Sequence, residues 1–470
     1  MVYWRQIRGI SDPIAIRQFD GVYKPDDEGF NLPENLFTEL INFGPDEYPA
    51  ISTRPGYTVV GTFGTGVLGF GAWEDQELHA IFNDGSWRRL NNDGTWTSLA
   101  TGLSTSAEWS FCNFQGNLTE INLIGANGTD PIKRYNGTIV QDLANAPAGG
   151  NYVTTQANRL YCAVANIIKF SALRKPSDWT TVNDAGEVVH ETPDGETING
   201  LKAGNGNVTT FKPSSTYELY GKGPTSYALE KIAADIGVTG NKAVAVYDDV
   251  LHYTSTDGLY HYAGGLRSKK EFSIPIQNYI YGMNQAQKSK CVSGSDEKYL
   301  YFGIPYGAGA TQNNRIIQYD HGHQTWYTWD NIAVTQMIKV GEYLYLGDAS
   351  GRVLRVGGTT DNGSAITATA ITKPFTAKSI SRKQQWFKLW VVASIPSGSS
   401  LSVYVSGAAS GENWTLAKIM AADTNIQYRE ILIPTNSISA ANAVRLKLVA
   451  TGPVTIHEIT RQLRELPMRR

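Results

Sequence analysis

The segment Val250–Tyr262 reads VLHYTSTDGLYHY, an apolar strand, a tight turn at Asp257-Gly258 and a second short strand that ends in aromatic residues. Three more segments follow this template: Leu78–Leu90 (LHAIFNDGSWRRL), Ile121–Tyr135 (INLIGANGTDPIKRY) and Tyr343–Val356 (YLYLGDASGRVLRV). Asp-Gly and Asn-Gly pairs favour type I′ hairpin turns, because both central residues of such a turn need positive φ. Hairpins of one style that recur about every 45 residues are typical of a β-propeller, in which each repeat forms one sheet.

The number of blades follows from the centres of the strands that end these hairpins. The centres lie roughly 36 to 57 residues apart, at Arg88, Lys133, Lys169, Glu218, Tyr260, Ile317 and Leu354. They predict seven blades, or six if one hairpin belongs to a surface loop. The widest interval contains the loop Tyr306–Asn314, which we expect to be an elongated surface hairpin.

Length and composition limit the class of protein. A chain of 470 residues favours two domains, and 47 glycines with 25 tyrosines favour turns and strands over helices. The formal net charge of −2 argues against a dedicated nucleic-acid-binding domain. No stretch of 18 apolar residues occurs, and residues 1–9 lack the apolar core of a secretory signal. We therefore expect neither a membrane span nor a secretion signal.

Changes of pattern along the chain predict three parts. Residues 1–57 are rich in Pro, Asp, Asn and Gly, and we interpret them as an extended arm laid over the propeller, which would cover residues 58–357. Beyond a polar linker, residues 358–470 contain strands that alternate apolar and polar positions, as in a jelly-roll-like β-sandwich, and end in a short basic tail. The sandwich strands are predicted at 366–371, 385–393, 401–405, 427–433, 443–449 and 454–461. Helical spacing is limited to Pro33–Phe43 and Ile274–Met283.

Candidate chemistry is sparse. The three cysteines, Cys112, Cys162 and Cys291, are far apart and form no C-x-x-C, so neither a disulfide framework nor a zinc knuckle is predicted. His321 and His323, with Asp320, could ligate a metal, but a surface turn is the favoured interpretation because no third ligand follows at a known spacing. We predict no catalytic residues, no cofactor and no required metal.

Basic residues on or beside the hairpin strands are the remaining candidate site. If these strands face a central pore, their side chains line it and contact a polyanion; otherwise they are simply exposed to solvent. The residues are Arg88, Arg89, Lys133, Arg134, Lys169, Arg315, Arg352 and Arg355. Contacts between subunits are predicted for Tyr306 and Asn314 in the long loop and for Phe37 and Phe43 in the arm, since the arm carries many apolar residues.

Several segments, in this order, resemble the β-propeller proteins of tailed-bacteriophage virions. Phe170–Trp179 (FSALRKPSDW) resembles a Ser…Pro-x-x-Trp blade segment, and Val444–Leu463 is similar to the closing strands of packaged-DNA stabilisation or tail-nozzle proteins. The other segments that carry the resemblance are Ser52–Tyr57, Ile198–Leu201, Val208–Lys212, Ser215–Gly221, Ser255–Tyr260, Phe272–Ile280 and Ile316–Asp320. It covers most of residues 50–357 and, more weakly, the C-terminal part.

The resemblance implies a non-enzymatic virion component, made in the host cytoplasm, that forms a ring at a nozzle or connector and helps retain or guide the packaged genome. Its expected partners are copies of itself, tail proteins on the adaptor or portal side and on the fibre or needle side, and genomic DNA through non-specific contact. The alternative is a glycan-binding or glycan-cleaving propeller with a carbohydrate-binding sandwich, where Trp386, Trp390 and Trp414 would stack on sugars. Trp386 and Trp390 are predicted to share one face of their strand, so both could equally pack in the core.

Overall fold

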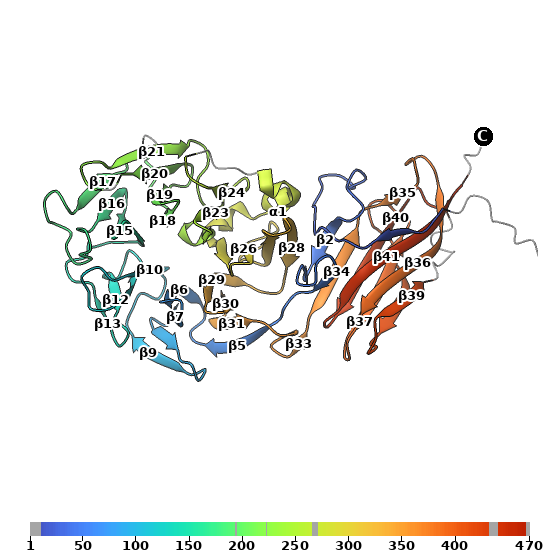
Figure 1. Ribbon diagram of the computed structural model, residues 1–470, viewed down its shortest axis with the longest axis horizontal. Helices are drawn as coiled ribbons and strands as arrows, with labels where there is room; N and C mark the ends of the chain where they lie inside the picture. Colours follow the sequence, from blue (N-terminus) through green and yellow to red (C-terminus); the bar gives the residue numbers. More distant parts are fainter. Residues whose placement is uncertain (1–10, 193–194, 222, 266–270, 432–439, 467–470) are drawn as a thin grey trace, which may run out of the picture. The chain divides into compact units, whose positions relative to one another are not determined.

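The computed structural model describes residues 11–192, 195–221, 223–265, 271–431 and 440–466. The chain forms two compact units. The first, called the propeller unit, comprises Thr58–Ile317 and Asn331–Val356; the second, the sandwich unit, takes the described parts of Met1–Tyr57, Gln318–Asp330 and Gly357–Arg470. Both units consist of β-strands (Figure 1). The predicted basic tail, Pro467–Arg470, lies outside the described residues.

The propeller unit is organised around a closed cycle of inner strands. Each inner strand contacts the next one along the chain, and the last contacts the first. In order they are β6 (Val67–Trp73), β10 (Ser110–Phe114), β14 (Tyr152–Gln156), β18 (Gly200–Gly204), β22 (Val244–Tyr247), β25 (Val292–Ser295) and β29 (Val334–Val340). This closed cycle is the defining feature of a β-propeller.

Antiparallel sheets extend outward from the inner strands. Four are complete: β6 with β7 (Glu77–Phe82), β8 (Trp87–Leu90) and β9 (Trp96–Ala100); β10 with β11 (Asn122–Ala126), β12 (Lys133–Tyr135) and β13 (Val140–Asp142); β14 with β15 (Arg159–Val164), β16 (Ile167–Phe170) and β17 (Gly186–Val189); β18 with β19 (Asn207–Phe211), β20 (Thr216–Tyr220) and β21 (Ala228–Ala233). A three-stranded sheet joins β22, β23 (Val250–Thr254) and β24 (Leu259–Tyr262), and another four-stranded set joins β29, β30 (Tyr343–Asp348), β31 (Arg352–Val356) and β5 (Tyr57–Thr62).

The remaining position in the cycle is filled by β25 and its antiparallel partner β26 (Tyr299–Ile304). The next strand, β27 (Arg315–Asp320), crosses the boundary between the two units. Six sheets are thus built on the cycle, one fewer than the seven blades that the strand spacing favours and equal to the six that it allows, and the β25–β26 hairpin fills the remaining position. The predicted helix at Ile274–Met283 is present as the 3-10 helix η2 (Glu271–Ile276) followed by α1 (Gln277–Tyr281).

The four template segments occupy equivalent places, which confirms the propeller prediction. They form the hairpins β7–β8, β11–β12, β23–β24 and β30–β31, the second and third strands of their sheets. Nearly every residue of these second strands is buried, as in β11, because sheets of a propeller stack on both faces of one another. Burial on both faces requires a continuous apolar run, and that run is the signal visible in the sequence.

The turn of the first hairpin shows why glycine is needed there. Gly85 has a φ of +77°, and a Cβ placed on it would lie 2.7 Å from the carbonyl oxygen of Leu103. The amide of Leu103 donates a hydrogen bond to the carbonyl of Gly85 at 3.0 Å. The turn therefore requires both positive φ and close approach of a second chain segment.

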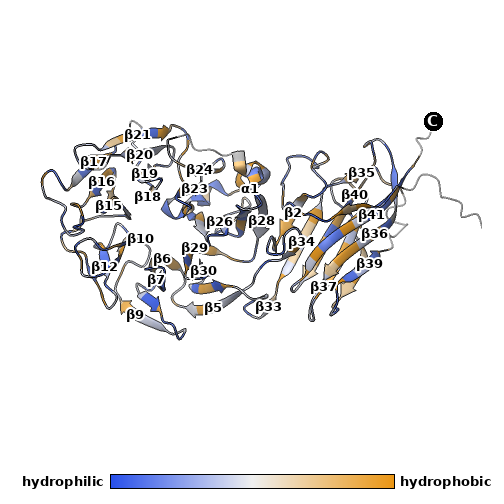
Figure 2. Ribbon diagram, viewed as in Figure 1, coloured by the Kyte–Doolittle hydropathy of each residue, from blue (hydrophilic) through white to orange (hydrophobic). Residues whose placement is uncertain are grey.

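The sandwich unit contains two sheets. One has the order β3 (Phe43–Gly44), β4 (Ile51–Thr53), β41 (Thr455–Glu465), β36 (Gln384–Ser394), β39 (Gln427–Ile431), with β1 (Ile14–Ile16) also on β41; the other has β28 (Thr325–Trp329), β2 (Phe37–Ile41), β34 (Thr367–Thr372), β40 (Ala443–Thr451), β37 (Ser400–Ser406), β38 (Thr415–Ala421). Leu401, Val403 and Val405 alternate with half-buried neighbours along β37. Polar and apolar colours alternate along the long strands in Figure 2, as expected for sheets buried on one face.

The arm predicted over the propeller instead belongs to the sandwich unit. β2 pairs with β34 in an antiparallel ladder, and β1 pairs with β41. Phe37 and Phe43 are 2% and 0% exposed. The helix predicted at Pro33–Phe43 is wrong, because the backbone of β2 completes hydrogen bonding between β34 and the parallel strand β28. Burial of these residues within the chain removes the apolar surface on which the prediction of arm-mediated contacts rested.

Candidate functional site

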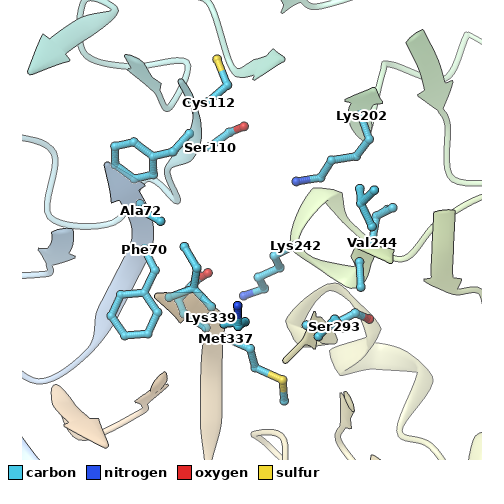
Figure 3. Close-up of a pocket in the computed structure, with 18 of the residues that line it drawn as sticks. Phe70, Ala72, Ser110, Cys112, Lys202, Lys242, Val244, Ser293, Met337 and Lys339 are labelled. Atoms are coloured by element: carbon cyan, nitrogen blue, oxygen red, sulfur yellow. The ribbon is translucent and has the colours of Figure 1, made fainter. Parts of the chain in front are cut away.

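The propeller unit contains a cavity of about 910 Å³ between its inner strands, and this cavity is open to solvent. Residues of β6, β10, β18, β22, β25 and β29 line it, and Figure 3 shows side chains from these strands around one space, with Lys202 and Lys242 extending into it. A smaller cavity of about 260 Å³ shares Trp109, Ser110 and Lys242 with the first. We call the larger space the axial cavity and treat it as the candidate site, since central clefts of this size commonly bind ligands.

Polar side chains, most of which line the axial cavity, join neighbouring positions of the cycle. At each of the seven junctions, one such side chain forms a hydrogen bond with the main chain of a neighbouring position. The pairs are Asn113 Nδ2 with Ala72 O (2.8 Å), Ser110 Oγ with Val153 O (3.3 Å), Thr154 Oγ1 with Ala203 N (3.1 Å), Asn241 Oδ1 with Leu201 N (3.0 Å), Ser293 Oγ with Ala243 O (2.9 Å), Asn313 Nδ2 with Val334 O (2.8 Å) and Gln336 Nε2 with Leu68 O (3.2 Å).

The reason for these junction bonds is geometric. Inner strands of adjacent sheets belong to separate hydrogen-bonded ladders, so their facing main-chain groups need other partners. Short hydroxyl and amide side chains supply them. The hydroxyls of Ser110 and Ser293 are therefore engaged with carbonyl groups, which gives them a structural role in closing the cycle.

Three lysines reach the axial cavity: Lys202 on β18, Lys242 in the 3-10 helix η1 (Asn241–Ala243) and Lys339 on β29. Lys242 pairs with Glu108, and Lys339 Nζ lies 2.7 Å from Glu297 Oε1. Hydrogen bonding to Glu297 raises the pKa of Lys339. For Lys202, burial lowers the pKa of the ammonium group. Lys202 thus differs from the other two in having its charge disfavoured by its surroundings.

Burial disfavours the thiolate form of all three cysteines. Burial raises the pKa of Cys112, which lines the axial cavity, far above its usual range. Burial also raises the pKa values of Cys162 and Cys291 to about 12. A thiol with such a pKa is protonated at neutral pH and is a poor nucleophile.

The basic residues predicted to line the channel do not lie in the lining of the axial cavity. Those of β8, β12, β16 and β31 are on third strands, separated from the inner strand by another strand, which corrects the prediction. Most have acidic partners: Arg88 with Asp84, Arg89 with Glu77, Lys133 with Asp142, Lys169 with Glu187 and Arg352 with Asp348.

The other three basic candidates are held by polar or aromatic neighbours. Arg134 Nη1 donates to Asn122 Oδ1 at 3.2 Å. The guanidinium carbon of Arg355 lies 5.0 Å from the ring centre of Tyr343, and that of Arg315 lies 5.6 Å from the ring centre of Tyr306. These positions fit packing within the blades, not a lining for a polyanion.

The predicted contact residues also have partners within the chain. Asn314 Oδ1 accepts a hydrogen bond from the amide of Tyr306 at 2.7 Å, and its Nδ2 donates to the carbonyl of Tyr306 at 3.0 Å. These bonds close the loop that the sequence marked as a surface hairpin. Phe37 and Phe43 are core residues of the sandwich unit, so their assignment as subunit contacts is wrong.

The structure also places the candidate metal ligands of the His321–His323 turn and the tryptophans that were considered for sugar binding. His323 Nδ1 lies 2.8 Å from Asp320 Oδ2, and its ring stacks on Tyr48 at 3.9 Å between ring centres. Among the residues that the structure describes, no group of three or more His, Cys, Asp or Glu could hold a metal. Trp386 and Trp390 do not share a face, because a bulge between Trp386 and Lys388 shifts the register; Trp386 is buried and Trp390 is half-buried.

Comparisons with known proteins show resemblance in fold and little in sequence. No family model matches the chain, and no curated protein matches it. Solved structures that it resembles include a streptogramin B lyase (12% identity, TM-score 0.44, 62% of this chain and 93% of that chain) and virginiamycin B lyase from Staphylococcus aureus (11%, 0.45, 63% and 95%). Another is the WD40 β-propeller domain of Doa1 (11%, 0.42, 64% and 97%). In the described ranges, no helix is long and apolar enough to cross a membrane.

Proposed function

We propose that the chain is a structural component of a bacteriophage tail that works by self-association and by binding neighbouring tail proteins. The ordered resemblance of its segments to virion propellers supports the virion assignment. The engagement of the hydroxyls of Ser110 and Ser293 in closing the cycle supports a role based on contacts.

The proposed self-association is supported by exposed apolar side chains on the edge strands of the sandwich unit. β38 and β39 are the last strands of their sheets and contact each other. On or beside them, four large apolar side chains are exposed: Leu416 (44%), Ile419 (55%), Ile426 (48%) and Tyr428 (75%). We call these residues the edge strip. Exposed edge strands with apolar side chains favour pairing with another chain. In a ring of identical subunits, the chain that binds the edge strip is a second copy of this protein.

The proposal includes a revised path for the genome. Because the predicted basic residues lie on outer strands and are mostly ion-paired, the propeller cavity is not assigned to DNA. In the proposed ring, the axial passage is the space enclosed by several subunits. Contact with the genome is then non-specific and made by the ring as a whole.

Light scattering coupled to gel filtration tests the self-association. We expect the purified chain to run as a discrete multiple of its 51.5 kDa mass, and Ile419→Asp with Tyr428→Asp to reduce it to a monomer. A matched control is Val182→Asp, which changes an apolar residue of the propeller unit that is 81% exposed. A monomeric wild-type chain at all concentrations would contradict the proposal.

A groove on the sandwich unit supports glycan binding as a second candidate function. It has a volume of about 480 Å³ and is lined by Trp414, the carboxylates of Asp26, Asp27 and Glu39, and Arg445. An aromatic face beside carboxylates and a guanidinium group suits the apolar and hydroxyl faces of a sugar. A glycan array distinguishes the two functions: specific binding that is lost in Trp414→Ala would favour host-surface recognition, and no binding would favour the tail component.

A further inference from the structure

We propose that the axial cavity binds a compact multivalent oxyanion and that the ammonium group of Lys202 is its principal contact. This site is independent of the proposed tail function.

Lys202 projects from β18 into the axial cavity, opposite the side formed by Ser110 and Cys112 (Figure 3). Lys242 and Lys339 reach the same space from two other positions of the cycle. Three ammonium groups, two on strands and one in η1, thus reach one volume from separate positions of the cycle. A rigid arrangement of this kind is suited to an anion that carries more than one charge.

The acidic groups near the cavity are distributed unevenly. Glu108 and Glu297, the partners of Lys242 and Lys339, have side chains that are 53% and 77% exposed, while those lysines are 12% and 20% exposed. The remaining carboxylates of the lining, Asp75 and Asp248, are exposed as well. The two paired carboxylates are therefore more exposed than the ammonium groups that they contact.

Lys202 is the charge without a counter-ion. Across the described ranges, no carboxylate forms an ion pair with it, and Cys112 is the neighbouring titratable group that acts on its pKa. Removing an ammonium group from water without a partner is unfavourable, so an anion that enters the cavity gains an interaction that the empty protein lacks.

The lining also limits the ligand. A volume of about 910 Å³ admits a small organic or inorganic anion. Phe70, Val244 and Met337 supply apolar surface, while Asn113 and Asn241 supply amides. A phosphate ester and a polycarboxylate share the required chemistry: several oxygen atoms that bear negative charge on a compact body.

Calorimetric titration of the full chain with sodium triphosphate and, separately, with citrate tests the proposal. We expect at least one of them to bind with a Kd below about 1 mM, and the stronger one shows whether phosphate or carboxylate is preferred. Lys202→Met is expected to weaken binding at least tenfold. The matched control Lys169→Met removes an outer-strand lysine that is paired with Glu187, and it should bind like the wild type.

Failure of both anions to bind, or equal affinity in Lys202→Met and the wild type, would overturn the proposal. If Lys202→Met does not fold, acetylation of the wild-type chain by acetic anhydride, followed by mass spectrometry, replaces it. Triphosphate or citrate should then slow modification of Lys202 and leave Lys169 unaffected. Equal rates for Lys202 with and without both anions would overturn the proposal in that case.

Discussion

Asn313 tests the role assigned to the junction bonds. Its side chain is 2% exposed, and its Nδ2 donates to the carbonyl of Lys290 at 2.6 Å and to that of Val334 at 2.8 Å. Lys290 precedes β25, and Val334 begins β29, so one amide group joins two neighbouring positions of the cycle. Asn313→Ala removes both bonds and leaves two carbonyl groups without this donor.

The expected cost follows from these two bonds. Each hydrogen bond contributes about 1 kcal/mol net, and a buried polar group left without a partner adds about 1 kcal/mol or more. We therefore expect Asn313→Ala to lower the free energy of unfolding of the propeller unit by roughly 2–4 kcal/mol. The effect should appear as earlier loss of the propeller unit, since both junction partners belong to it.

Urea unfolding followed by tryptophan fluorescence measures the change. The neighbouring variant Asn314→Ala is the matched control, because its exposed side chain bonds only with Tyr306 in its own loop among the described residues. We expect that control to cost less than about 1 kcal/mol. Equal effects of the two variants, or a loss below about 0.5 kcal/mol for Asn313→Ala, would refute the assignment of junction bonds as closures of the cycle.

Three further predictions concern pH, turn geometry and a buried ion pair. Burial lowers the pKa of His79, whose Nδ1 accepts a hydrogen bond from Trp87 Nε1. On acidification, the unfolded chain therefore takes up a proton at His79 that the folded chain does not. Stability should therefore fall as the pH drops below about 6.5, and chemical unfolding of His79→Gln at several pH values should show a flatter dependence; an unchanged slope would contradict this. Gly85→Ala should lower the stability of the protein more than Gly94→Ala does. Nothing lies within 4 Å of a Cβ at Gly94, so that variant loses only about 1 kcal/mol from its positive φ. Thermal melts that rank the two variants equally would contradict the close approach at Gly85. Arg54 donates hydrogen bonds to the carboxylate of Asp361 at 2.8 and 2.9 Å. Arg54→Met leaves that carboxylate without its partner and should destabilise the sandwich unit by about 3 kcal/mol. In urea melts, a loss as small as that expected for a surface ion pair would contradict this prediction.

The outward strands of the propeller could be predicted from the sequence because their signals are local. The pattern of Val250–Tyr262 combines an apolar run with a two-residue turn, and both features act within one hairpin. The inner strands carry weaker signals. β18 reads GLKAG, in which short and polar residues serve the junctions and the cavity, so Lys202 was not found as a candidate. The position of β18, directly before the hairpin of β19 and β20, is the sequence signal that marks Lys202 as an inner-strand residue.

Six sandwich strands after residue 357 were predicted close to their observed places, although residues 432–433 of one prediction lie outside the described residues. β38 (Thr415–Ala421) and the strands of the arm were missed. Alternation along β37 and β40 is visible in the sequence because one face of each is buried. β2 lacks such a pattern, and it pairs Phe37 with Thr372, far along the chain. The sequence also placed Trp390 on the wrong face of β36, because the bulge between Trp386 and Lys388 arises from pairing with β41.

The central claim is that this chain is a structural part of a phage virion. Quantitative mass spectrometry of purified phage particles from the source genome tests it most directly. The account predicts that the chain is present in each particle in several copies, in fixed ratio to the other tail proteins. Particles that lack the chain, while the infected cells contain it, would contradict the claim.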